Sequence, residues 1–150
     1  MALFDETSFS TLEVSGSGAF ALLQSLTDND LNRPPGSVTY TQLLNERGGV
    51  ECDLTLTRLG ADRFLLVTGS AFGVHDLAWI GAHAPSDGSV RLDDVTVRDT
   101  CLGLFGPRAR DVLQRVTAGD VSHAAFPYMR ARGLTVAGVP VLALRVTYVG

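Results

Sequence analysis

Asp53 is the residue whose type and position best suit it to handle a proton. Two alternating apolar segments, Val38–Leu44 and Val50–Leu59, flank Gly48–Gly49, a pattern that predicts a β-hairpin. Side chains on a strand alternate between two faces, so we expect Asp53 to lie on the face opposite Leu54. A carboxylate on a strand holds a proton acceptor still. The other interpretation is an acid on a solvated sheet face or one that supports the turn, and the pattern alone favours this interpretation.

The other acidic residues, the histidines and the cysteines point less clearly to a catalytic or metal-binding site. Asp93 and Asp94 are adjacent, and neighbours on a strand point to opposite faces, so we do not expect them to act as an acid–base pair. Glu46 lies in the predicted turn and is expected to be a surface charge. No metal site is predicted, because the histidines and cysteines lack the spacing of metal ligands. These residues are His75, His83, His123, Cys52 and Cys101.

Two tyrosines are candidates for contacts with a flat ligand. Tyr128 lies in the apolar segment Phe126–Met129, where Pro127 restricts the backbone and a ring can stack on a heteroaromatic group. Tyr148 ends the last predicted strand, where its phenol can face a pocket. Packing in the core is the alternative for both rings.

The elements that would position these residues alternate between strands and helices. The pattern predicts an α+β fold with an antiparallel or mixed sheet and interspersed helices. Helices are predicted over Ala19–Leu26, over 71–84 with Ser70 as N-cap, and over 107–116 with Pro107 in the first turn. No internal repeat of fixed period is visible. Further strands are predicted over Ser10–Val14, Arg63–Thr68, Val90–Val97, Thr100–Phe105, Leu134–Val136 and Pro140–Tyr148.

Composition narrows the functional classes. The chain has 150 residues, 45% of them hydrophobic, a net charge of −4, and no lysine among its 12 basic residues. Schiff-base and P-loop lysine chemistry are therefore excluded, and an acidic chain is not expected to bind nucleic acid. No apolar run approaches the roughly 18 residues of a membrane span, and no signal peptide is visible. We expect a cytoplasmic protein without a membrane partner.

Several ordered segments resemble the glycine-cleavage T-protein (aminomethyltransferase) family. They are YTQLLNERGGVECDLTLTRL from Tyr40, RFLLVTGSAF from Arg63, LGLFGPRARDVLQ from Leu102, and the run from Phe126 through GVPVLALRVTYVG. The chain is most similar to the tetrahydrofolate-binding part of dimethylglycine and sarcosine dehydrogenases. The resemblance implies a folate-binding aminomethyltransferase domain with ferredoxin-like elements. Residues 1–150 would be a truncated part of it, without its C-terminal part or the following barrel.

The resemblance also implies a function and a site. The expected reaction is transfer of an aminomethyl or methylene unit to tetrahydrofolate, which forms 5,10-methylenetetrahydrofolate. Asp53 corresponds to the catalytic carboxylate near the folate nitrogens, and Tyr128 and Tyr148 correspond to aromatic residues of the folate pocket. Further acidic residues of that pocket would lie beyond Gly150, so we expect the isolated fragment to be inactive.

The partners follow from the same resemblance. The donor would be a small amine or aminomethyl compound, with a fused FAD-containing dehydrogenase domain or a lipoyl carrier protein as partner. A non-catalytic folate-binding module, or one of the iron–sulfur-assembly type, is the alternative on the same scaffold. The cysteine-bearing motif that marks iron–sulfur-assembly relatives is missing at Tyr148–Gly150, which favours the enzyme.

Overall fold

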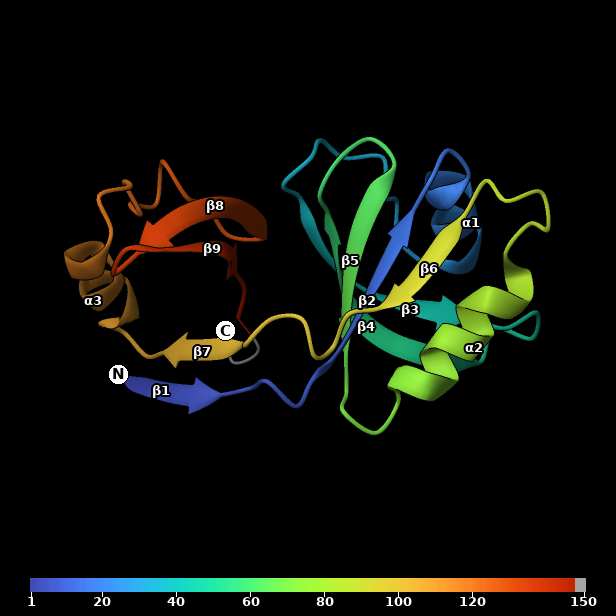
Figure 1. Cartoon of the computed structure of the whole chain (residues 1–150), viewed down its shortest axis with the longest axis horizontal. Helices are drawn as coiled ribbons and strands as arrows, with labels where there is room; N and C mark the ends of the chain where they lie inside the picture. The colour runs from blue at the N-terminus through green and yellow to red at the C-terminus, as the bar shows by residue number, and fades with distance from the viewer. Residues whose placement is uncertain (148–150) are drawn as a thin grey trace. The chain divides into compact units, whose positions relative to one another are not determined.

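The computed structural model describes residues 1–147, which form two compact units (Figure 1). The large unit comprises Thr7–Cys101, and the small unit comprises Met1–Glu6 together with the chain from Leu102. None of the helices in residues 1–147 has the length and apolarity that crossing a lipid bilayer requires.

An antiparallel sheet of five strands forms the framework of the large unit, in the order β3-β4-β5-β2-β6. Strands β3, β4 and β5 follow one another in the sequence and pair as hairpins. Strand β2 pairs with β5 and β6, which come much later in the chain. The strands are β2 (Ser10–Ser15), β3 (Val38–Leu44), β4 (Val50–Arg58), β5 (Arg63–Thr68) and β6 (Arg91–Asp94).

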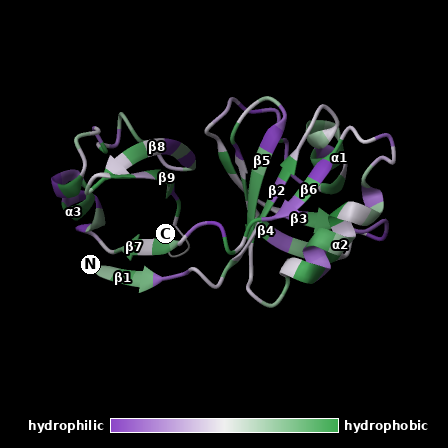
Figure 2. Cartoon of the chain, in the orientation of Figure 1, coloured by the Kyte–Doolittle hydropathy of each residue, from purple (hydrophilic) through white to green (hydrophobic). Residues whose placement is uncertain are grey.

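Helices α1 (Ala19–Leu26) and α2 (Gly73–His83) pack against one face of this sheet. Apolar residues recur every second position on β2 and β4 and every third or fourth position on α1, so these elements present one apolar side. Figure 2 shows hydrophobic and hydrophilic stretches side by side on α2, as expected for a helix that buries one side. The fully buried core residues include Leu12, Val14, Leu23, Leu54, Phe64, Leu66 and Ile80.

The small unit contains two short antiparallel strand pairs and one helix. β1 (Ala2–Asp5) pairs with β7 (Leu102–Phe105), α3 covers Ala109–Val116, and β8 (Arg130–Val136) pairs with β9 (Val139–Arg145). Ala137 and Gly138 join the last two strands with φ of 49° and 86°, which suits a two-residue hairpin turn. A small core surrounds the buried residues Val121, Phe126 and Leu134.

The α+β class is confirmed, and every strand pairing in residues 1–147 is antiparallel rather than mixed. Strand β1 was not predicted. The prediction that a strand extends to Val97 is wrong, because β6 ends at Asp94. The Asp94 carboxylate accepts a hydrogen bond from the Thr96 backbone N–H at 2.9 Å, which turns the chain away, and Val97 is 99% exposed.

The prediction of Ser70 as N-cap is also wrong. Helix α2 begins at Gly73 with Phe72 in the cap position, and no side chain caps it. The Ser70 hydroxyl instead donates to Ser8 Oγ at 3.3 Å. Gly73 lies against Ser10 so closely that an added Cβ would clash with the Ser10 side chain. Close packing against β2 therefore sets where α2 starts.

Each unit contains a strand–glycine–helix–turn motif whose glycine has a positive φ, a repeat that the sequence pattern did not predict. Gly16 follows β2 and Gly106 follows β7, with φ of 111° and 110°. A helix of eight residues comes next in both, α1 in one and α3 in the other. Residues of the second copy (102–121) lie 90 positions after their counterparts in the first copy (12–31).

Candidate functional site

Asp53 lies on the sheet face of the large unit that α1 and α2 do not cover. Strand β4 buries Cys52, Leu54 and Leu56 in the core, while Asp53 is exposed on the opposite side. The predicted alternation is therefore confirmed. Because cross-strand partners share a face, the pairing of Gln42 with Asp53 puts both side chains on this uncovered face.

Tyr40 holds the Asp53 carboxylate in place. The Tyr40 hydroxyl donates to Asp53 Oδ2 at 2.5 Å, although both residues are exposed. On the neighbouring strand β3, Tyr40 pairs with Thr55, one diagonal step from Asp53. A short bond between a phenol and a carboxylate fixes the direction of the carboxylate, and the strand pairing fixes its backbone.

Asp28 lies at the outer edge of β3, next to the same strand segment. Its Oδ1 accepts hydrogen bonds from Thr41 Oγ1 at 2.7 Å and from the Gln42 backbone N–H at 3.1 Å. The hydrogen bond from Thr41, followed by that from Gln42, lowers the pKa of the Asp28 carboxyl below its ordinary value. Asp28 therefore stays ionised and anchors the segment that carries Gln42.

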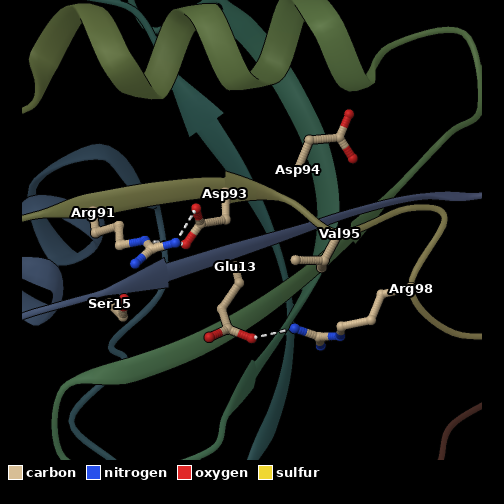
Figure 3. A pocket seen from close by; sticks show the side chains of 7 residues that line it. All are labelled: Glu13, Ser15, Arg91, Asp93, Asp94, Val95 and Arg98. Atoms are coloured by element: carbon tan, nitrogen blue, oxygen red, sulfur yellow. Dashed lines mark hydrogen bonds and ion pairs between the residues drawn. The ribbon is translucent and has the colours of Figure 1, made fainter.

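A second candidate is an open hollow of about 390 Å³ between β2 and β6, shown in Figure 3. Glu13 lies in it and binds Arg63 Nε at 2.8 Å and Arg98 NH1 at 3.0 Å. These guanidinium groups, Arg63 first, lower the pKa of Glu13 to about 2. Asp93 is paired with Arg91 at 2.6 Å. Because these charges are paired with one another, the hollow is best explained as a surface ion-pair network.

Asp93 and Asp94 point to opposite faces, as predicted. Asp93 lies opposite Glu13 on the uncovered face, whereas Asp94 lies opposite the core residue Leu12. The histidines are exposed, in agreement with the prediction. One of them, His75, nevertheless lies beside the buried residues Cys52 and Asp76 on the helix-covered side of the sheet.

The predicted site residues fall in different parts of the chain. Asp53 and Tyr40 come together within the large unit. Tyr128 belongs to the small unit, where it is 52% exposed between α3 and β8 and precedes Met129, whose φ is 57°. Tyr148 lies outside the described residues. The contributions of Tyr128 and Tyr148 to a pocket stay predictions.

The family assignment comes from comparison with known proteins. The model of the GCVT N-terminal domain family matches residues 1–150. The chain belongs to this family. This GCVT N-terminal domain is 39% identical to an aminomethyltransferase from Geobacillus thermodenitrificans over 99% of the chain. It is 33% identical to the mitochondrial dimethylglycine dehydrogenase of Homo sapiens over 100% of the chain.

A solved structure supports the fold of the GCVT domain. The glycine cleavage system aminomethyltransferase T from Bartonella henselae aligns with 86% of the chain at a TM-score of 0.74 and 28% identity. The chain covers 34% of that structure, 40% of the Geobacillus protein and 17% of the human protein. The GCVT domain therefore spans less than half the length of these relatives.

Sequence reasoning found Asp53 but missed its partners. It did not identify Tyr40, which binds Asp53, or Asp28, which anchors the neighbouring strand segment. The hairpin turn alone would not have revealed Tyr40, because it pairs Leu44 with Val50, and only a register shift between Leu43 and Leu44 sets Gln42 opposite Asp53. No local signal connects Asp28 with Thr41 either, since that contact depends on how the chain returns from α1 to β3.

Proposed function

We propose that this GCVT domain serves tetrahydrofolate-dependent one-carbon transfer, with an aminomethyl or methylene donor and 5,10-methylenetetrahydrofolate as product. The proposal is carried by one observation, the Asp53 carboxylate held on β4 by the Tyr40 hydroxyl at 2.5 Å. Family membership supplies the reaction class, and Asp53 supplies a fixed acid–base group suited to it.

The chemistry assigned to this chain is proton handling and charge stabilisation. When bound, tetrahydrofolate supplies the ring nitrogens that accept the one-carbon unit. The Asp53 carboxylate accepts a proton from an N–H group and stabilises positive charge that develops nearby. Tyr40 keeps Asp53 Oδ2 in one direction, so that less reorganisation is needed when the charge appears.

The groups around Asp53 are compatible with a pterin ring. Pterins present N–H donors and a flat face, which carboxylate oxygens and aromatic rings can bind. The uncovered face offers the Asp53 carboxylate, the half-exposed Tyr40 ring and the Gln42 amide. We further propose that Tyr128 and Tyr148 add aromatic surface to the folate pocket.

The remaining partners belong to the whole protein and are also proposals. The human relative is named a dehydrogenase, and the chain matches 17% of it. We therefore propose a small amine as donor and an attached FAD-containing dehydrogenase domain as its source. A lipoyl carrier protein is the corresponding partner if the whole protein resembles the aminomethyltransferases.

Calorimetric titration of the full-length protein with tetrahydrofolate tests this proposal. We expect binding by the parent protein and affinity within a few-fold in Asp53→Asn, because the amide keeps the shape of the carboxylate. Glu46→Gln is the matched control, since Glu46 is an acid exposed in the turn of the same hairpin. Absence of binding by the parent would refute the proposal. Binding without transfer under any donor would support the non-catalytic alternative.

A further inference from the structure

Three groups that commonly bind metals meet where the first turn of α2 lies against β4. Cys52 Sγ and one ligand atom each of His75 and Asp76 all lie within 4.8 Å of one another. Cys52 is 2% exposed and Asp76 is 1% exposed, whereas the His75 side chain is 52% exposed. The cluster therefore has a buried wall and one side open to solvent.

Neighbouring groups hold the buried carboxylate in a defined orientation. Thr68 Oγ1 donates to Asp76 Oδ2 at 2.7 Å, which leaves Asp76 Oδ1 turned toward His75 Nδ1 at 3.0 Å. Gly73 allows the start of α2 to pack closely against Ser10 on β2, and this packing brings the first turn of the helix onto the sheet.

A β-bulge brings a further carboxylate to the cluster. The register of β3 and β4 shifts between Leu43 and Leu44, so Glu51 is the extra residue of β4 at this point. Glu51 Oε2 lies 3.9 Å from His75 Nε2, the ring nitrogen that does not face Asp76. A histidine that binds a metal through one nitrogen typically donates its other N–H to a carboxylate, and Glu51 lies within ion-pair distance of that nitrogen.

We propose that Cys52 Sγ, His75 Nδ1 and Asp76 Oδ1 bind a divalent ion of the Zn²⁺ class, with Glu51 as the outer partner of His75 and a water as fourth ligand. Thiolate, imidazole and carboxylate are the protein ligands that Zn²⁺ uses. Bonds of about 2.0–2.3 Å in a tetrahedron place ligand atoms roughly 3.3–3.7 Å apart. The His75 side chain is half-exposed, so it has room to rotate and open its 3.0 Å contact with Asp76 Oδ1 to this separation.

Binding through sulfur requires the Cys52 thiol to lose its proton to solvent. A bound dication offsets the negative charge of both the carboxylate and the resulting thiolate. The bound ion would connect β4 to the start of α2. Sequence spacing predicted no metal site because Cys52 and His75 lie on elements far apart in the chain.

Cobalt substitution provides a direct test that is independent of folate. Co²⁺ added to the full-length reduced protein should produce a sulfur-to-cobalt charge-transfer band with release of one thiol proton, and Zn²⁺ should then displace Co²⁺ and remove the band. Cys52→Ser should abolish the band, while Cys101→Ser, which changes the exposed cysteine, should leave it intact. Circular dichroism of each variant shows whether the fold is kept.

If Cys52→Ser fails to fold, substitution of the exposed His75 still tests the proposal. His75→Gln should weaken Zn²⁺ affinity by about 10–100-fold or more, and Glu51→Gln by about tenfold. His83→Gln, on the same helix and also exposed, should leave the affinity unchanged. A missing charge-transfer band in the folded parent, or a band and affinity equal in His75→Gln and His83→Gln, would overturn the proposal.

Discussion

The two copies of the strand–glycine–helix–turn motif have the same local backbone but different surroundings. Gly16 and Gly106 share a left-handed φ that only glycine adopts readily. In each copy a glutamine on the helix closes the following turn. Gln24 Oε1 accepts from the Leu31 N–H at 2.8 Å, and Gln114 Oε1 accepts from the Val121 N–H at 3.1 Å.

The two copies differ in how much of their helix is buried. In the first copy Ala19, Leu22, Leu23 and Leu26 of α1 are buried against a five-stranded sheet. In the second copy no residue of α3 is fully buried, and Leu113 only partly packs against the small core. Local turn chemistry therefore determines the backbone of the motif, whereas the size of the neighbouring sheet determines how much its helix contributes to stability.

Two acidic side chains of the first copy have no counterpart in the second copy. Asp28, which anchors the strand next to Asp53, corresponds to Ala118 in the second copy. Glu13, which binds two arginines, corresponds to Gly103. An added Cβ at Gly103 would clash with the Phe105 side chain, so the second copy has no room for an acid there. The motif thus carries charged side chains that bind neighbouring groups in the large unit, whereas in the small unit the corresponding position 103 is closely packed.

Truncation of the equivalent leucines should give the largest difference between the copies. Leu23→Ala should lower the free energy of unfolding of the large unit by about 3 kcal/mol, because it leaves a cavity in a closed core. Leu113→Ala should cost about 1 kcal/mol, since Leu113 is already partly solvated. Urea unfolding, followed by hydrogen exchange in each unit, measures both, and equal losses would contradict the burial difference.

Alanine at the paired glycines should give the next largest effects. Gly16→Ala and Gly106→Ala should both cost about 1–2 kcal/mol for the left-handed φ. Gly16→Ala should cost roughly 1 kcal/mol more, because its Cβ would clash with the Ser89 carbonyl oxygen. Thermal unfolding of the two variants gives the comparison, and a larger loss for Gly106→Ala would show that the clash is relieved.

The glutamine side chains should contribute similarly in both copies. Gln24→Ala and Gln114→Ala should each cost about 1 kcal/mol, the typical net value of lost hydrogen bonds to backbone groups. Hydrogen exchange at the Leu31 and Val121 amides reports each turn directly. Protection lost at Leu31 but kept at Val121 would mean that the glutamine closes the turn in only one copy.

Loss of the Glu13 ion pairs at low pH should give the smallest of these effects on stability. The folded pKa of Glu13, about 2, lies below its ordinary value of 4.5, so its stabilisation is full above that value and is lost as the pH falls toward 2. After solvent screening at the half-exposed arginines, we expect about 1 kcal/mol. Glu13→Gln should flatten this part of the pH–stability curve. An unchanged curve would mean that the ion pairs contribute nothing.

Sequence alone was sufficient wherever local periodicity and turn chemistry decide the structure. The ranges of α1, β3 and β5 were predicted to the residue. Sequence alone was insufficient for features that depend on contacts between residues far apart in the chain. Strand β1 forms only because β7 pairs with it, and the start of α2 depends on Ser10 of β2.

The site shows the same division between local and distant information. Asp53 was found from alternation and from resemblance to the family, and its exposure on the uncovered face is confirmed. The hydrogen bond from Tyr40 required the register of β3 and β4, and the cluster of Cys52, His75 and Asp76 required the packing of α2 on the sheet. A cytoplasmic location stays a prediction.

The rate of one-carbon transfer to tetrahydrofolate in the full-length protein tests the central claim most directly. Under single-turnover conditions, Asp53→Asn should slow transfer by about 10²–10⁴-fold, the range expected for loss of a positioned acid–base group. Tetrahydrofolate affinity should stay within a few-fold of the parent, and Glu46→Gln should match the parent in both quantities. An Asp53→Asn variant that transfers the one-carbon unit at the parent rate would contradict the role assigned to Asp53.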